Sequence, residues 1–301
     1  MEGKARVRQG GGAVGAAAMH AVSVFKLRIG AAITLSALVG LAVTDGPRLG
    51  AGKVALLAAA VFLSSASAGA FNQYFERDID ARMQRTRRRP FVSGAYRANG
   101  RWLAAIAAML AAAVAAAAIS LNGLAALYVF LGAFVYGIIY TVWLKRRTVL
   151  NIVVGGLAGS FAVLAGSAAV DPSMPPQPVP LLLALALFFW TPPHFWSLAA
   201  ALRDDYARAG VPMLPVVVGE RTTAAAILGH TVVLFAVSLL PIAFGMGWVY
   251  FAGAAVGGGL FLWRSLALFR HPTPAAAMAN FSASLVQLSC LLAGAMLDRL
   301  A

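Results

Sequence analysis

Nine hydrophobic stretches, separated by short polar connections, constrain the possible fold of this chain more than any other feature. They cover residues 29–44, 51–72, 102–120, 124–142, 151–170, 180–201, 224–244, 246–263 and 278–297. Each stretch is near the roughly 20 residues that a helix needs to cross a bilayer. Within lipid only helices and closed barrels satisfy their own backbone polar groups. The sequence therefore predicts an all-α, polytopic membrane protein with about nine transmembrane helices.

The composition agrees with this class, because only 11% of the residues are charged and 61% are hydrophobic. A soluble domain carries roughly 25% charged residues. The single cysteine, Cys290, excludes an intramolecular disulfide and a cysteine-rich zinc or iron–sulfur site.

Lysine and arginine orient the predicted bundle in a cell inner (cytoplasmic) membrane. With a cytoplasmic N-terminus, 21 of the 24 basic residues lie on the inner side and only Arg48, Lys53 and Arg299 lie outside. Such an excess is typical of cytoplasmic loops. The net charge of +14 is therefore a topology signal and does not by itself indicate nucleic-acid binding.

Residues 1–28 are basic and rich in glycine and alanine, which predicts a mobile cytoplasmic tail. A cleaved signal is the alternative, but the first apolar run begins only at Ile29, after Lys26 and Arg28. We therefore expect that run to be retained as the first membrane helix, and residues 29–301 to form a single transmembrane domain.

Five of the ten acidic residues occur in two clusters, each following a hydrophobic stretch on the inner side. In the first cluster, Asn72, Glu76 and Asp80 have the spacing i, i+4, i+8, which places them on one face of a helix. Asp78 points roughly away from that face. The second cluster is the pair at residues 204–205. The pattern favours a divalent metal site at the membrane surface.

A solvated helix end is the alternative interpretation of the first cluster, with its carboxylates paired to Arg77, Arg82 and Arg85. An ionised carboxylate in a membrane costs roughly 2.5–3.5 kcal/mol, so either a cation or such partners are required. Oxygen ligands suit Mg²⁺, which is commonly held by one or two carboxylates together with substrate phosphates. Nearby arginines would then bind the oxygens of the same phosphorylated ligand.

Four stretches, in order along the chain, resemble the UbiA-type intramembrane prenyltransferase superfamily and, within it, the haem branch. They cover residues 72–90, 140–151, 190–196 and 205–215. The third stretch, Trp-Thr-Pro-Pro-His-Phe-Trp, is the one typical of the haem branch. The resemblance implies a nine-helix bundle around a central cavity that is open to the cytoplasmic side, with both acidic motifs at its entrance.

The resemblance also implies a reaction and its substrates. In the haem branch, farnesyl diphosphate alkylates a vinyl group of protoheme IX (haem B) with Mg²⁺, water adds and diphosphate leaves. The lipid bilayer surrounds the enzyme, and a haem-modifying or terminal-oxidase assembly protein is a conceivable partner. One departure is residues 160–167, where the haem branch usually has prolines and a tryptophan, which puts acceptor contacts in the fifth helix in doubt.

The site residues that this resemblance implies fall into three groups. The metal ligands are Asn72, Glu76, Asp80 and Asp205. The catalytic residues are Asp80, Asp205 and His194. The substrate-binding residues are Arg28, Arg85, Lys145, Arg146, Arg203 and Tyr206. Lys145 and Arg146 also have an alternative interpretation as topology signals in a short inner loop.

His194 follows Pro192 and Pro193 in the sixth hydrophobic stretch, where the prolines predict a broken or kinked helix. An intramembrane histidine is a functional candidate, and with haem as substrate it could ligate iron or act on the added water. A hydrogen-bonded packing histidine is equally compatible with the sequence.

Three other functions stay open at this level. A related prenyltransferase would use a quinone precursor or another tetrapyrrole as acceptor. A cation-coupled transporter would also carry carboxylates within a multi-span body, although transporter sites usually lie near the bilayer midplane on broken helices. A non-enzymatic membrane assembly factor would leave the two acidic clusters unexplained.

Overall fold

The structure is a computed structural model that describes residue 15 and residues 18–300. The predicted tail at residues 1–14, 16 and 17 lies outside the described residues. Eight helical spans of the described part are long and apolar enough to cross a membrane, and a ninth is formed if the bent pair Ala18–Val24 and Leu27–Ala42 counts as one span. The prediction of an all-α polytopic membrane protein with about nine spans is confirmed.

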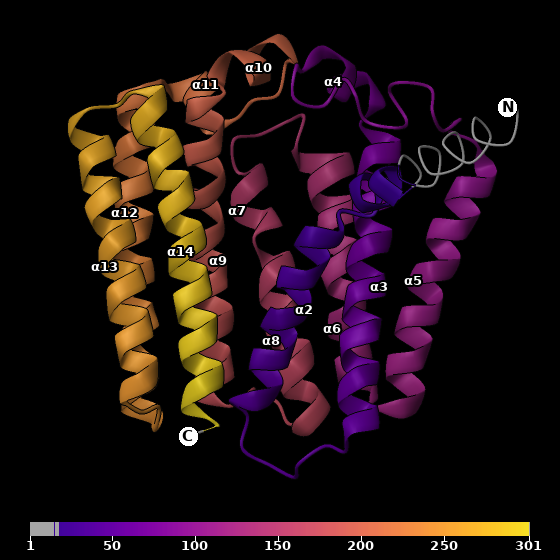
Figure 1. The fold of residues 1–301 in the computed structure, drawn as a ribbon, viewed down its shortest axis with the longest axis vertical. Coiled ribbons are helices and arrows are strands. Elements are labelled where there is room, and N and C mark those ends of the chain that lie inside the picture. Colours follow the sequence, from indigo (N-terminus) through magenta and orange to yellow (C-terminus); the bar gives the residue numbers. More distant parts are fainter. Residues whose placement is uncertain (1–14, 16–17, 301) are drawn as a thin grey trace, which may run out of the picture.

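The spans follow the predicted stretches closely. They are α2 (Leu27–Ala42), α3 (Ala51–Phe75), α5 (Gly100–Ser120), α6 (Gly123–Phe134) with the π-helix η1 (Val135–Leu144), α7 (Asn151–Gly155) with α8 (Leu157–Val170), α9 (Pro178–Ala201), α12 (Glu220–Leu239) with the 3₁₀ helix η2 (Leu240–Phe244), α13 (Trp248–Arg270) and α14 (Pro274–Asp298). Three short helices, α4 (Arg77–Arg82), α10 (Arg203–Arg208) and α11 (Leu214–Val218), gather at one end of the long ones (Figure 1).

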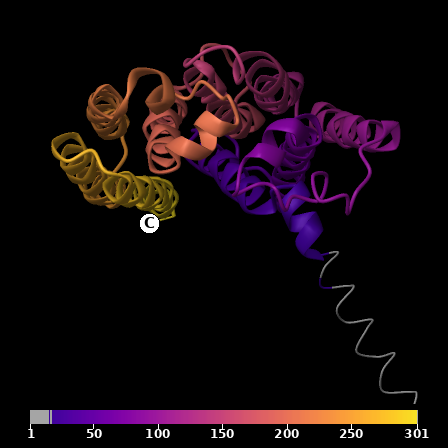
Figure 2. The ribbon, with the colours of Figure 1, turned by 90° about the horizontal axis from the view of Figure 1, so that it is seen from above.

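Seen from above, the helices form a curved arrangement with α13 and α14 at one end and α5 at the other (Figure 2). The starts of three helices are determined locally by side-chain caps. The oxygens of Asn99, Asn122 and Thr273 accept hydrogen bonds from the amides of Trp102, Ala125 and Ala276 at the first turns of α5, α6 and α14. Such caps satisfy amides that have no partner within the helix.

Two glycines allow α2 and α8 to pack backbone against backbone. A Cβ atom at Gly40 would lie 2.1 Å from the carbonyl oxygen of Val163, and one at Gly166 would lie 1.8 Å from that of Ala37. No larger residue fits at either position without moving a helix. Small residues serve the same purpose at many helix contacts within membranes.

The structure differs from the sequence prediction in two places near functional residues. The packed part of the chain begins before residue 28, because Val24 is fully buried and the Gln73 amide donates to the Ser23 carbonyl at 2.6 Å. A broken or kinked helix was expected at Pro192 and Pro193, and α9 continues through both prolines without a break. Proline has no N–H, so the carbonyls of Phe188 and Phe189, four residues before the two prolines, lose their usual helical donors. The Ser197 hydroxyl adds a hydrogen bond to the Pro193 carbonyl at 2.6 Å.

Candidate active site

A cavity of about 770 Å³ lies at the end of the bundle that carries α4 and α10. Its walls come from the start of α2, the end of α3, α4 and the turns after it, η1, α7, the end of α9 and α10. Charged and polar side chains line it together with aromatic and aliphatic ones, among them Tyr140, Phe195 and Met213. A cavity with a few convergent polar groups and an apolar remainder is the usual form of a small-molecule site.

Asn72, Glu76 and Asp80 all line this cavity and are each no more than 2% exposed. Glu76 sits at the junction where α3 ends and α4 begins. The backbone bonds from the Glu76 amide to the Asn72 carbonyl (3.0 Å) and from the Asp80 amide to the Glu76 carbonyl (2.8 Å) preserve the i, i+4 relation through the junction. The predicted shared face is therefore present despite the change of helix.

Each of these three side chains is paired with a basic residue from another part of the chain. Lys145 Nζ lies 2.5 Å from Glu76 Oε2, and Arg89 donates to both oxygens of Asp80 at 2.7 and 2.9 Å. Lys26 Nζ donates to Asn72 Oδ1 at 2.6 Å. Glu76 and Asp80 pair with these distant residues and not with the neighbouring Arg77, Arg82 or Arg85, so these two carboxylates do not form the solvated helix end.

Lys26 and Arg89 are site residues that the sequence analysis missed. Lys26 was assigned to the tail, yet it lines the cavity and adopts a left-handed conformation with φ of 49°. Arg89 is one of many arginines after α4, and its sequence position carries no signal that separates it from the others. The sequence signal for Lys26 was its position three residues before the apolar run that begins at Ile29.

The residues present fit a divalent cation that shares its coordination with a ligand. Glu76 Oε1 is buried and has no hydrogen-bond partner. Asn72 and Asp80, which carry amide and carboxylate oxygens, line the same cavity. Within the described residues, no group of three or more His, Cys, Asp or Glu side chains forms a complete metal site. Mg²⁺ typically takes one or two carboxylates and completes its shell with phosphate oxygens and water.

Asp205 lies outside the set of residues that line the cavity. Its carboxylate accepts hydrogen bonds from the amides of Gln84 (3.3 Å) and Arg85 (3.5 Å) and from the side chain of Arg208. Burial raises the pKa of Asp205, but the Gln84 amide and the Arg208 guanidinium outweigh this effect and hold the pKa below its usual value. In this conformation Asp205 joins α10 to the segment that carries Arg85.

Four of the six predicted substrate-binding residues line the cavity: Arg28, Arg85, Lys145 and Tyr206. The other two do not. Arg146 forms a two-bond pair with Asp78 at 2.7 and 2.8 Å, and Arg203 donates to the Pro215 carbonyl at 3.0 Å.

The exposed position of Asp78 confirms that it points away from the face of Glu76 and Asp80. Its side chain is 53% exposed, and the hydrogen bond from Arg146 lowers the pKa of Asp78.

His194 packs inside the bundle and is not among the residues that line the cavity. Its ring is stacked between Trp190 and Phe281, with centroid separations of 4.1 and 4.5 Å, and its Nδ1 lies 2.6 Å from Ser284 Oγ. These contacts favour the packing alternative for His194, whereas the neighbouring Phe195 reaches the cavity.

Comparisons with known proteins show which protein family has this architecture. The UbiA prenyltransferase family matches residues 33–291. Protoheme IX farnesyltransferase 2 of Paramagnetospirillum magneticum is 57% identical over 92% of this chain and 96% of its own length. A protoheme IX farnesyltransferase of Methylococcus capsulatus is 40% identical over 91% of each chain.

Two solved structures share the fold. A UbiA homologue from Aeropyrum pernix has a TM-score of 0.74 at 23% identity and covers 90% of this chain and 98% of its own. One from Archaeoglobus fulgidus, described as bound to GPP and Mg²⁺, has a TM-score of 0.69 at 16% identity and covers 94% of this chain and 100% of its own.

Proposed function

Because this chain belongs to the UbiA prenyltransferase family, we propose that it transfers a farnesyl group from farnesyl diphosphate to a vinyl group of protoheme IX, with addition of water and release of diphosphate. The names of relatives that are up to 57% identical support the donor and the acceptor. The observation that carries the proposal is the buried face of Asn72, Glu76 and Asp80, paired with three basic residues on the wall of one cavity.

The acidic face would bind the metal, and its basic partners would bind the diphosphate oxygens. Asn72, Glu76 and Asp80 would hold Mg²⁺, which when bound neutralises charge on the leaving diphosphate oxygens. Lys145 and Arg89 then exchange a carboxylate for a phosphate oxygen, which accepts charge-assisted hydrogen bonds equally well. Preorganised cations of this kind stabilise a leaving group in the transition state more than in the bound substrate.

The reaction breaks the allylic C–O bond, and the electron pair leaves with the diphosphate. The allylic carbon forms a bond to the terminal vinyl carbon, and water adds its hydroxyl group to the other vinyl carbon and loses one proton. Bulk water must not reach the allylic cation first. The cavity wall of Tyr140, Phe195 and Met213 excludes it, and the two aromatic rings attract a nearby cation by roughly 0.5–2 kcal/mol each.

The spans make the chain a multi-pass membrane protein. We place it in the cytoplasmic membrane with the cavity entrance in the cytoplasm, because α4, α10 and α11 lie at the end of the bundle where the basic connections concentrate. Farnesyl diphosphate, which carries a charged head, reaches such an entrance from water.

Mass spectrometry of the haem product tests the proposal directly. Purified protein is given protoheme IX, farnesyl diphosphate and Mg²⁺, with EDTA in a parallel reaction. We expect a haem that carries a hydroxyethylfarnesyl group, formed only with the metal. Diphosphate release with a quinone precursor but not with haem would assign another acceptor, and no release with any acceptor would exclude prenyl transfer.

Asp205→Ala should lower farnesyl transfer by at least about tenfold, because the amides of Gln84 and Arg85 lose the carboxylate that holds the segment carrying Arg85. The effect should appear as a raised KM for farnesyl diphosphate, since Arg85 lines the cavity. Asp204→Ala is the matched control, because Asp204 is the exposed neighbour. Equal losses in both variants would refute the anchoring role, and a changed Mg²⁺ requirement in Asp205→Ala alone would assign Asp205 to the metal.

A further inference from the structure

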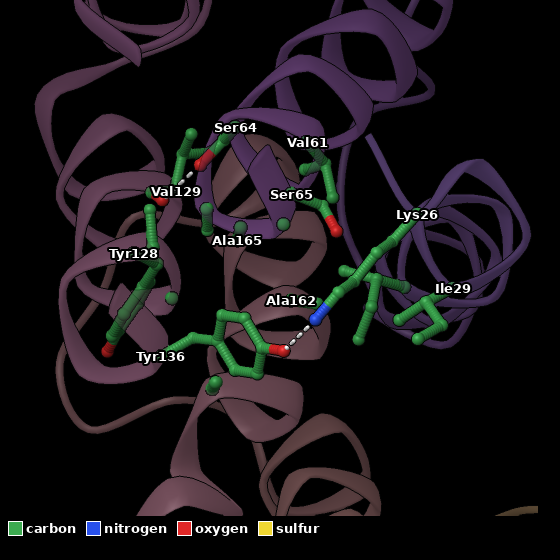
Figure 3. Close-up of a pocket in the computed structure, with 16 residues that line it drawn as sticks. Lys26, Ile29, Val61, Ser64, Ser65, Tyr128, Val129, Tyr136, Ala162 and Ala165 are labelled. Carbon is green, nitrogen blue, oxygen red and sulfur yellow. Dashed lines mark hydrogen bonds between the residues drawn. The ribbon is translucent and has the colours of Figure 1, made fainter. Parts of the chain in front are cut away.

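A second, smaller cavity of about 80 Å³ adjoins the first and extends between α2, α3, α6 and α8 (Figure 3). The two cavities share Lys26, Ile29 and Tyr136. At this junction Lys26 Nζ donates to the Tyr136 hydroxyl at 2.8 Å, as the dashed line in Figure 3 shows. We call the smaller cavity the side pocket.

The wall of the side pocket suits an uncharged, apolar group. Its lining holds four hydroxyls, those of Ser64, Ser65, Tyr128 and Tyr136. Ser64 donates to the Val129 carbonyl at 3.0 Å, Tyr128 donates to Met174 Sδ at 3.4 Å, and Tyr136 accepts from Lys26. The remaining wall is aliphatic and mostly small, with Ile29, Ile33, Val61, Ala68, Gly69, Gly132, Ala133, Ala158, Ala162 and Ala165. Beyond Lys26, a ligand in this pocket would meet no charge within the described lining.

The direction of the helices gives the depth of the side pocket. Tyr136 lies at the junction with the main cavity, and Tyr128 lies eight positions earlier in α6. At a rise of 1.5 Å per residue this separation is about 12 Å. Tyr128 is held at the deep end by its bond to Met174 and by stacking on Phe161 at 5.9 Å between centroids. On α8, Ala158 lies beside Gly132, since a Cβ atom at Gly132 would be 3.5 Å from the Ala158 carbonyl oxygen. Ala165 lies about two turns farther along α8, at the deep end of the side pocket.

We propose that the side pocket receives the distal end of the isoprenoid chain, and that Ala165 and Tyr128 set the longest chain that the enzyme accepts. The inference rests on the proposed function. The diphosphate head is held by Glu76, Asp80 and their basic partners on the main cavity wall, so the tail must leave in the direction of an uncharged wall. The side pocket adjoins that cavity, and the two share Lys26, Ile29 and Tyr136 in their walls.

Two variants should change the accepted chain length in opposite directions. Ala165→Leu fills the deep end and should weaken farnesyl binding by at least about tenfold, because a few misplaced methylene groups in a fitted apolar pocket have effects of this size. Dimethylallyl binding should stay within about twofold, because that chain ends before the deep end. Tyr128→Ala removes the deep wall and should improve geranylgeranyl binding relative to farnesyl binding by at least about fivefold.

The test uses thiolo-diphosphate analogues of the dimethylallyl, geranyl, farnesyl and geranylgeranyl donors, bound to purified full-length protein with Mg²⁺. Ala108→Leu is the matched control, since Ala108 lies on the exposed face of α5, and it should keep the wild-type profile. Ala162→Val offers a smaller obstruction should Ala165→Leu not fold, and it should weaken farnesyl more than dimethylallyl.

The possible outcomes separate this inference from the proposed function. If the wild-type protein binds no analogue, the proposed function itself fails. If it binds the farnesyl analogue and both side-pocket variants keep its chain-length profile, the tail lies elsewhere and the side pocket is left to a lipid chain. A loss that is equal for all four lengths would likewise overturn the assignment of Ala165 and Tyr128 as the length limit.

Discussion

Asp80→Ala should lower the rate of farnesyl transfer by about 10³-fold or more, since one change removes a proposed metal ligand and the partner of Arg89. Asp80 is 2% exposed and bonds Arg89 through both oxygens. Without the carboxylate, Arg89 is free to occupy the space where metal and diphosphate would meet. We expect kcat to fall more than the affinity for farnesyl diphosphate, because charge on the leaving group is greatest in the transition state.

Asp78→Ala is the matched control for this prediction. It removes a carboxylate from the same short helix, two residues away, but Asp78 is 53% exposed and faces Arg146 outside the cavity. Exposed ion pairs contribute little, so activity should stay within about twofold of the wild type. Thermal unfolding in detergent should show that both variants are folded. Near-normal turnover in Asp80→Ala, or an equal loss in Asp78→Ala, would contradict the assigned metal site.

Lys145→Met should raise the KM for farnesyl diphosphate by about 100-fold, because it removes a cation that would bind the diphosphate. It also leaves Glu76 buried without its partner, and truncating one member of a buried pair commonly costs about 3–5 kcal/mol of stability. Glu76 is poorly placed to tolerate this, since its other oxygen already lacks a hydrogen-bond partner. Lys145→Met with Glu76→Gln should therefore recover stability without recovering activity.

A metal titration without substrate distinguishes this role from a general loss of fold. In the wild type, Lys145 Nζ lies 2.5 Å from Glu76 Oε2 and would compete with a metal bound there. Mn²⁺ alone should therefore bind weakly, and added diphosphate should strengthen Mn²⁺ binding. Lys145→Met should bind Mn²⁺ alone more tightly but show a smaller gain from diphosphate. Arg147→Met, an exposed basic residue of the same connection, should leave both measurements unchanged. Weaker Mn²⁺ binding by folded Lys145→Met would contradict the competition.

The sequence predicted the features that depend on near neighbours in the chain. The spans were visible because each bilayer crossing needs its own apolar run. The face of Asn72, Glu76 and Asp80 was visible because helical spacing is local, and the backbone bonds at 3.0 and 2.8 Å kept that spacing across the α3–α4 junction. The position of Asp78 away from this face followed from the same periodicity.

Only the tertiary structure decided which residues meet across the bundle. Lys26 is 46 positions from Asn72, and Lys145 is 69 positions from Glu76. Likewise, the ring of His194 packs against Phe281 and does not line the cavity. The side pocket is formed by residues of four helices that are far apart in the sequence. A helix has one periodicity but many possible neighbours, so the sequence determined which face of each span is polar, while the packing of the helices determined what that face contacts.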